Sequence, residues 1–183
     1  VASIYDENLF LDHVMNPKMQ LYEYDYKMIL SQINDLYNDE IMSNFDKFPI
    51  SMQLAFLDYL SYQTSLNEQS LLFFESILQS VHKEFRIKAL KAINSFGMVS
   101  SLEPYYRFTM SEEWEERLMV SKILRLVSSD EVYAMLNTLI CDRNWRVRKQ
   151  AAETLKGKKD GEERLGEIVN QQEDRFAADM AKE

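Results

Sequence analysis

A period of 31 residues constrains the fold of this chain more than any other feature of its sequence. Three segments align at this spacing without gaps, and each has an arginine at the same position, namely Arg86, Arg117 and Arg148. Three further positions repeat in register: Ala89, Val120 and Ala151; Leu90, Ser121 and Ala152; and Ile93, Leu124 and Leu155. Their i, i+3, i+4 and i+7 spacing predicts one amphipathic helix in each segment. Such units cannot bury their apolar faces alone, so the period predicts a stack with one shared core.

The start of each predicted helix is marked by a residue six positions before its arginine. Ser80, Ser111 and Asp142 occupy these positions, and we expect each side-chain oxygen to cap its helix by accepting an exposed amide. Trp114 and Trp145 also lie 31 residues apart. A fourth, looser copy lies upstream at a spacing of 33, where Met52, Phe56, Leu57 and Leu60 correspond to Phe85, Ala89, Leu90 and Ile93.

Partner helices are predicted between these segments. Two of them show clear apolar stripes: Leu71, Phe74, Ile77, Leu78 and Val81 in residues 69–81, and Val132, Met135, Leu136, Leu139 and Ile140 in residues 130–141. The third runs from Leu102 to Phe108, with Pro104 in its first turn, where a missing amide costs little. Alternating helices of this kind predict antiparallel pairs stacked into a short α-solenoid.

Composition supports an all-α fold. The chain has 183 residues but only 4 Gly and 3 Pro, whereas a β-rich fold needs turn residues at short intervals. Cys141 is the only cysteine, which excludes an intrachain disulfide and favours a reducing compartment. It follows Leu139 and Ile140, so we expect it to be a small buried side chain. We therefore expect a cytoplasmic protein, or the cytoplasmic part of a longer, membrane-anchored chain.

One repeat resembles a known family. The stretch Asp142-Arg143-Asn144-Trp145-Arg146-Val147-Arg148-Lys149-Gln150-Ala151-Ala152-Glu153-Thr154-Leu155 is similar to the second helix of a HEAT repeat, with its Asp, Val-Arg, Ala-Ala and Leu. The earlier copies have Phe85-Arg86 and Glu116-Arg117 in place of Val-Arg, and serine in place of the Asp. Pro104 also lies where HEAT first helices often have proline. The resemblance covers about residues 51–160.

The HEAT resemblance implies a superhelix in which the Asp and the Arg form a ladder between adjacent repeats. The ladder positions here are Arg86, Arg117, Arg148 and Asp142. Only Asp142 supplies the acid here, so we expect the ladder to be incomplete, with the serine caps serving in the other repeats. The arginines are interpreted as structural residues.

Charge and periodicity divide the chain into three parts. Residues 1–48 are acidic and tyrosine-rich and are predicted to form a helical N-terminal cap outside the repeats, with a short helix from Ile4 to Val14 and one long helix over 21–44. Residues 49–160 contain the HEAT-like repeats, and residues 142–160 are basic. Residues 161–183 are predicted to form a C-terminal capping helix, whose apolar stripe is Leu165, Ile168, Val169, Phe176 and Met180.

The sequence contains no recognisable catalytic or metal-binding pattern. His13 and His82 lie in different regions, no two neighbouring glycines form a phosphate-binding loop, and no serine has a nucleophile-elbow context. The cluster Glu112, Glu113, Glu115 and Glu116 follows Ser111, where acidic side chains complement a helix dipole. We therefore predict a protein that is not an enzyme and needs no cofactor.

The leading hypothesis is a scaffold that binds another protein along the concave face built by the second helices. The predicted contact residues are Trp114, Trp145, Lys149 and, as a weaker candidate, Lys122. The alternatives are a HEAT-like enzyme or nucleic-acid-binding module, similar to DNA glycosylases or bilin lyases, or a regulatory domain of a larger protein. A net charge of −9 disfavours nucleic acid, and no residue pattern specifies an oligomeric state.

Overall fold

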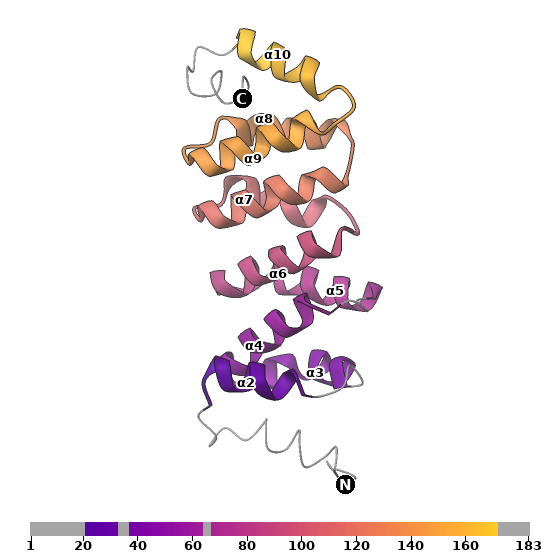
Figure 1. Ribbon diagram of the computed structural model, residues 1–183, viewed down its shortest axis with the longest axis vertical. Helices are drawn as coiled ribbons and strands as arrows, with labels where there is room; N and C mark the ends of the chain where they lie inside the picture. Colours follow the sequence, from indigo (N-terminus) through magenta and orange to yellow (C-terminus); the bar gives the residue numbers. More distant parts are fainter. Residues whose placement is uncertain (1–20, 33–36, 64–66, 172–183) are drawn as a thin grey trace. The chain divides into compact units, whose positions relative to one another are not determined.

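A computed structural model describes residues 21–32, 37–63 and 67–171, with side chains as far as residue 166. All regular secondary structure in these ranges is helical, which confirms the all-α prediction (Figure 1). The helix predicted from Ile4 to Val14 lies outside the described residues, as do Phe176, Met180 and the side chains of Ile168 and Val169. The contacts divide the chain into two compact units, with the boundary between Leu66 and Asn67.

The first unit is built around a pair of packed helices. Its elements are α2 (Glu23–Leu30), α3 (Asn38–Ser43), the 3₁₀ helix η2 (Phe45–Lys47) and α4 (Ile50–Ser61). Helix α2 packs against α4, and it buries Tyr26 and Leu30. Helix α4 buries the four apolar residues that the 33-residue spacing singled out, Met52, Phe56, Leu57 and Leu60. A salt bridge between Lys27 Nζ and Asp58 Oδ2, at 2.5 Å, links the two helices.

The prediction of one long helix over residues 21–44 is wrong. Helix α2 ends at Leu30 and a turn follows at Ser31 and Gln32, where the Ser31 hydroxyl donates to the Met28 carbonyl at 2.7 Å. Tyr22, which lies within the range of the predicted long helix, is 81% exposed. It precedes the helix in an extended conformation, and its amide donates to Asp25 Oδ2 at 3.0 Å.

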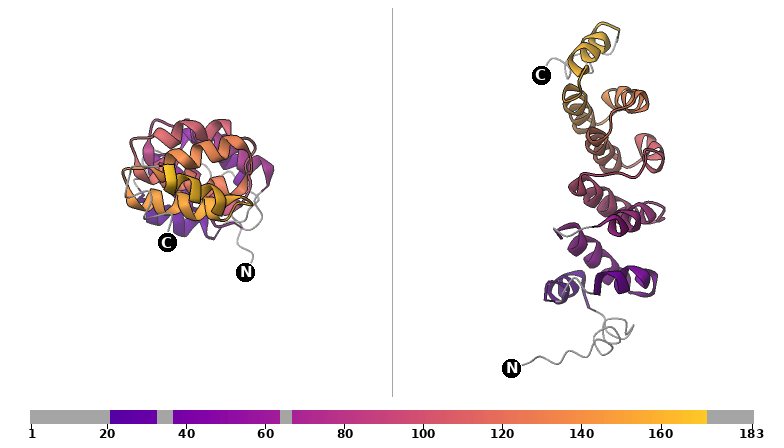
Figure 2. Two further views of the ribbon diagram at one scale, coloured as in Figure 1. Left: turned by 90° about the horizontal axis from the view of Figure 1, so that it is seen from above. Right: turned by 90° about the vertical axis from the view of Figure 1, so that its right-hand side faces the viewer.

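The second unit contains the 31-residue period. Its elements in chain order are α5 (Glu68–Ile77), α6 (Lys83–Phe96), the 3₁₀ helix η3 (Glu103–Met110), α7 (Trp114–Ile123), η4 (Leu124–Leu126), α8 (Asp130–Ile140), α9 (Trp145–Lys156) and α10 (Gly161–Gln171). Helix α7 contacts both α6 and α9, so these three second helices lie side by side. Helices α5, η3 and α8 form the row behind them (Figure 2).

The periodic apolar positions form the core of this unit. All nine residues at the three periodic positions after the arginines are buried, including Ser121, whose hydroxyl donates to the Arg117 carbonyl at 2.9 Å. The stripe predicted for residues 130–141 is buried from Val132 to Ile140. Val81 is wrongly predicted as a core residue, because α5 ends at Ile77 and Val81 lies in the following turn with 87% exposure.

Two other predictions about the partner helices need correction. Residues 103–110 form a 3₁₀ helix in place of an α-helix, with Pro104 in its first turn and Tyr105 and Phe108 buried. Cys141 is exposed, although we expected it to be buried, because α8 ends at Ile140 and Cys141 follows as its C-cap.

Glycine is required at two helix ends of the second unit. Gly97 ends α6 with a φ of 74°, in the left-handed region, and its amide donates to the Ile93 carbonyl. Gly161 begins α10 against the end of α9, where an added Cβ would lie 1.8 Å from the carbonyl oxygen of Leu155. A side chain at Gly161 would therefore force α9 and α10 apart.

Candidate protein-binding surface

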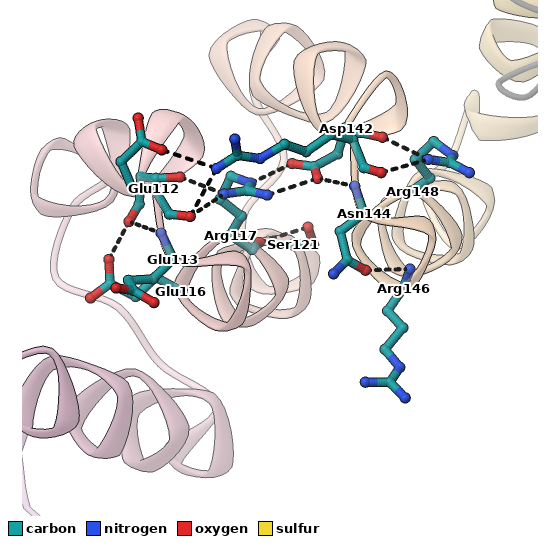
Figure 3. Close-up of polar contacts among 11 residues, drawn as sticks. Glu112, Glu113, Glu116, Arg117, Ser121, Asp142, Asn144, Arg146 and Arg148 are labelled. Carbon is teal, nitrogen blue, oxygen red and sulfur yellow. Dashed lines mark hydrogen bonds and ion pairs between the residues drawn. The ribbon is translucent and has the colours of Figure 1, made fainter.

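The three periodic arginines make the same local contact in each repeat. Each donates from Nη1 to the carbonyls of the residues six and five positions earlier: Arg86 to Ser80 and Val81 at 2.9 and 3.0 Å, Arg117 to Ser111 and Glu112 at 2.5 and 3.1 Å, and Arg148 to Asp142 and Arg143 at 2.8 and 3.3 Å. Figure 3 shows the second and third of these contacts. The arginine of each second helix thereby holds the turn through which the chain enters that helix.

The predicted capping residues belong to these same turns. Each accepts the amide of the residue two positions later: Ser80 from His82 at 3.2 Å, Ser111 from Glu113 at 3.1 Å, and Asp142 from Asn144 at 2.7 Å. The N-caps themselves are His82, Glu113 and Asn144, so the predicted cap positions are two residues too early. Serine and aspartate side chains close such two-residue turns as readily as they cap helices, and their type alone does not distinguish the two roles.

Carboxylates link each arginine to the next repeat. Arg117 donates from Nε and Nη2 to the two carboxylate oxygens of Asp142, at 2.5 and 3.0 Å. Arg86 donates from Nε to Glu116 Oε1 at 2.7 Å, and the Ser111 hydroxyl donates to the other oxygen of Glu116 at 2.5 Å. The prediction that only Asp142 supplies an acid is therefore wrong.

Glu116 was missed because it does not lie at the position in its repeat that Asp142 holds in the next one. It precedes Arg117 in the first turn of α7, at the register position of Phe85 and Val147, within the cluster that we assigned to the helix dipole. In this repeat the turn has Ser111, which cannot pair with Arg86 as a carboxylate does, and the longer Glu116 side chain reaches Arg86 from the helix. Glu116 is 1% exposed and Arg117 is 4% exposed. Buried charges of this kind need partners to offset their lost hydration, so this carboxylate–arginine pairing belongs to the interior and not to the candidate surface.

An arginine lies between the two tryptophans at the surface. Trp114 and Trp145 are the first residues of α7 and α9. The Arg146 Cζ atom is 5.3 Å from the ring centroid of Trp114 and 5.4 Å from that of Trp145. Both distances fall within the range of cation–π attraction. The structure thus joins the two predicted tryptophans into one cluster through a residue that sequence reasoning did not select.

The outer part of this tryptophan–arginine cluster faces solvent. Trp145 is 55% exposed, Trp114 is half-buried and Arg146 is exposed. The Arg146 guanidinium points away from the ladder (Figure 3), and no described residue accepts a hydrogen bond from it. Its amide, by contrast, is fixed by donation to Asn144 Oδ1 at 2.9 Å, which anchors the start of α9. The guanidinium therefore lies within cation–π distance of two aromatic rings, and none of its N–H groups donates to a described residue.

The other two predicted contact residues lie on the same row of helices. Lys149 is exposed, and it follows Arg146 by three residues, so both side chains project from one side of α9. Lys122 of α7 is half-buried. We define the second-helix face by Trp114 and Trp145 together with the following register positions: Glu84, Ile87, Lys88 and Lys91 of α6; Glu115, Leu118, Met119 and Lys122 of α7; and Arg146, Lys149, Gln150 and Glu153 of α9.

Lys158, from the basic segment 142–160, is buried and does not contribute to a surface. It is 8% exposed, and its ammonium donates to the carbonyls of Leu124, at 2.8 Å, Arg125, at 3.0 Å, and Val127. Burial lowers the pKa of Lys158. Its side chain satisfies carbonyls at the end of α7 and η4, so its role is to fasten the turn after α9 to the preceding repeat.

Within the described part of the chain, no group of three or more His, Cys, Asp or Glu side chains is arranged to hold a metal ion. No helix in the described ranges has the length and apolar character needed to cross a membrane.

No protein-family model matches the chain, and no curated protein matches it in sequence.

Proposed function

We propose that this chain is a non-catalytic scaffold with a HEAT-like α-solenoid fold, and that it binds another protein along the second-helix face. Three features support this proposal: the 31-residue register, the side-by-side packing of α6, α7 and α9, and the carboxylate–arginine pairs between successive repeats. Stacked repeats present an extended surface made of equivalent positions, and such surfaces are widely used to bind other proteins.

The observation that carries the proposal is the exposed cluster of Trp114, Arg146 and Trp145. Tryptophan and arginine are the residue types most enriched among the few that dominate binding energy at protein interfaces. An indole that is 55% exposed leaves apolar area in water, and a partner would remove that area from solvent.

The first test compares proteins retained from native lysate by the immobilised wild-type chain and by the Trp114→Ala/Trp145→Ala variant. We expect the double variant to lose the specific partner, and we expect Trp145→Ala alone to weaken binding of that partner by about 2 kcal/mol or more. The matched control is Tyr62→Ala, which removes an aromatic side chain that is 85% exposed outside the second-helix face. Thermal unfolding by circular dichroism checks that each variant is folded.

Two results would contradict the scaffold proposal. In the first, the double variant retains the same partner as the wild type. In the second, Trp145→Ala lowers the melting temperature but leaves binding unchanged, which would make the indole a packing residue.

A further inference from the structure

We propose that the second-helix face recognises an acidic peptide segment of its partner, and that Arg146 is the anchor for a carboxylate of that segment. The inference rests on the proposed function and specifies the chemistry of the partner at the same surface. It is carried by the geometry of Arg146, by the charges around it and by the residues that replace it in the earlier repeats.

Arg146 is arranged to receive a planar anion. Its guanidinium lies 5.3 and 5.4 Å from two indole centroids, and rings at these distances restrict the side chain before any partner arrives. Cation–π contacts do not use the N–H donors of a guanidinium, so these donors can form two parallel hydrogen bonds with a carboxylate. The periodic arginines differ in this respect, since Arg86, Arg117 and Arg148 already donate to backbone carbonyls.

The charges nearby favour an acidic partner. The second-helix face carries five basic residues, Lys88, Lys91, Lys122, Arg146 and Lys149, and three glutamates, although the whole chain has a net charge of −9. Lys149 is exposed on the same side of α9 as Arg146, so a second carboxylate of the same segment can pair with it. The second-helix face as a whole therefore carries a basic excess, which α9, the helix of Arg146, shares with α6.

The register of the repeats favours a peptide over a nucleic acid. Arg146 occupies the position that Glu84 holds in α6 and Glu115 holds in α7. A phosphate backbone running along the three helices would pass two carboxylates and would be repelled by them. A peptide with one or two acidic side chains needs only the basic positions of α9, and its apolar side chains can contact Trp145.

The experiment measures binding of a fluorescein-labelled synthetic peptide of Glu, Asp, Leu and Ser to the full chain. The comparison probes are the same peptide with Lys in place of Glu and Asp, and a short DNA duplex, in the same low-salt buffer. Tryptophan emission gives a second readout, because both tryptophans of the chain belong to the proposed site. We expect binding of the acidic peptide, a change in tryptophan emission on binding, and weaker binding as salt is added.

Two single substitutions test the role of Arg146. Arg146→Gln should weaken binding of the acidic peptide by about tenfold or more, because it removes the charge and the fork of donors. Arg146→Lys keeps the charge but loses the paired N–H donors of the guanidinium, so its affinity for the acidic peptide should lie between those of the wild type and Arg146→Gln. The matched control is Arg164→Gln, which removes the same charge from an arginine stacked on Tyr133, with Cζ 3.9 Å from the ring centroid. This control should change binding by no more than about twofold.

Three outcomes would overturn the inference. The acidic peptide fails to bind the wild-type chain; Arg146→Gln and Arg164→Gln bind it equally well; or the DNA duplex binds more tightly than the acidic peptide and depends on Arg146. In the first two cases, loss of a captured partner with the double tryptophan variant would leave the scaffold proposal standing. A partner retained by that variant would remove both proposals.

Discussion

At the scale of single residues, identical side chains have opposite roles in this protein because their burial differs. Arg117 is 4% exposed and pairs with Asp142, whereas Arg146 is exposed and lies within cation–π distance of two indoles. Lys158 is buried against three carbonyls, whereas Lys149, in the same basic segment, is exposed. A buried cation needs fixed partners to replace water, and an exposed one does not. Residue type therefore identifies candidates, and burial decides which of them can meet a partner.

Tyr105 provides a prediction at this scale. It is fully buried in η3 and its hydroxyl donates to Glu75 Oε1 at 3.0 Å. Burial, together with the nearby Glu75 charge, raises the pKa of Tyr105 well above its ordinary value of 10.0. The folded state thus holds this proton more tightly than the unfolded state does. We expect the stability that this contributes to be lost as the pH rises above about 10.

The measurement is urea unfolding of the wild type and Tyr105→Phe at neutral pH and above about pH 10. At neutral pH the variant should lose about 1 kcal/mol, because Glu75 loses a hydrogen bond. At high pH the difference should shrink or reverse, since phenylalanine has no proton to release. Tyr106→Phe serves as the control, because Tyr106 is 42% exposed. Unfolding free energies of the wild type and Tyr105→Phe that stay parallel across this pH range would contradict the assignment.

At the scale of elements, the entry turn and the second helix behave as one repeating structural unit. Each turn is closed by a serine or aspartate and is held by the arginine that follows six residues later. The carboxylate that pairs with each arginine comes from a different place in the next repeat: Glu116, in a helix, pairs with Arg86, and Asp142, in a turn, pairs with Arg117. Both pairs thus place a carboxylate beside the arginine of the preceding repeat, although the acid comes from different sequence positions.

The Arg86–Glu116 pair provides a prediction at this scale. Glu116→Ala should cost about 3 kcal/mol of unfolding free energy, because it leaves Arg86, whose side chain is 18% exposed, without its carboxylate. A double-mutant cycle with Arg86→Ala should give a coupling energy of about 1 kcal/mol or more. The control is Glu112→Ala, which breaks a surface pair with Arg143 at 3.0 Å and should cost less than about 0.5 kcal/mol. Equal losses for Glu116→Ala and Glu112→Ala would exclude a structural role for the buried pair.

At the scale of the whole molecule, the chain forms two compact units, and only the second contains the repeats with the strict 31-residue spacing. Helix α4 matches the repeats at a spacing of 33, yet it packs against α2 in the first unit. The repeats with the strict 31-residue spacing all lie in the second unit, where α5 to α10 pack on one another. From residue 67 onward, the segments that repeat in sequence therefore also pack together, whereas α4 matches the repeats in sequence but belongs to the other unit.

This division predicts that residues 67–183 fold without the first unit. The three aligned second helices, their partner helices and both carboxylate–arginine links lie within this segment, so it contains the contacts that a repeat array requires. We expect the isolated segment to retain its helical circular dichroism and to unfold cooperatively in urea. A fragment that is unfolded under conditions where the full chain is folded would contradict this expectation.

The sequence by itself determined the all-helical character, the 31-residue register and most of the core. These follow from apolar spacing, which acts within one helix and can be read along the chain, as at Phe85, Ala89, Leu90 and Ile93. The tertiary structure decided which polar residues meet. Glu116 reaches Arg86 across 30 positions, Arg146 lies between tryptophans of two helices, and Lys158 reaches carbonyls of the preceding repeat. Such contacts depend on the distance between two helices in space, and the local sequence pattern of one helix does not encode that distance.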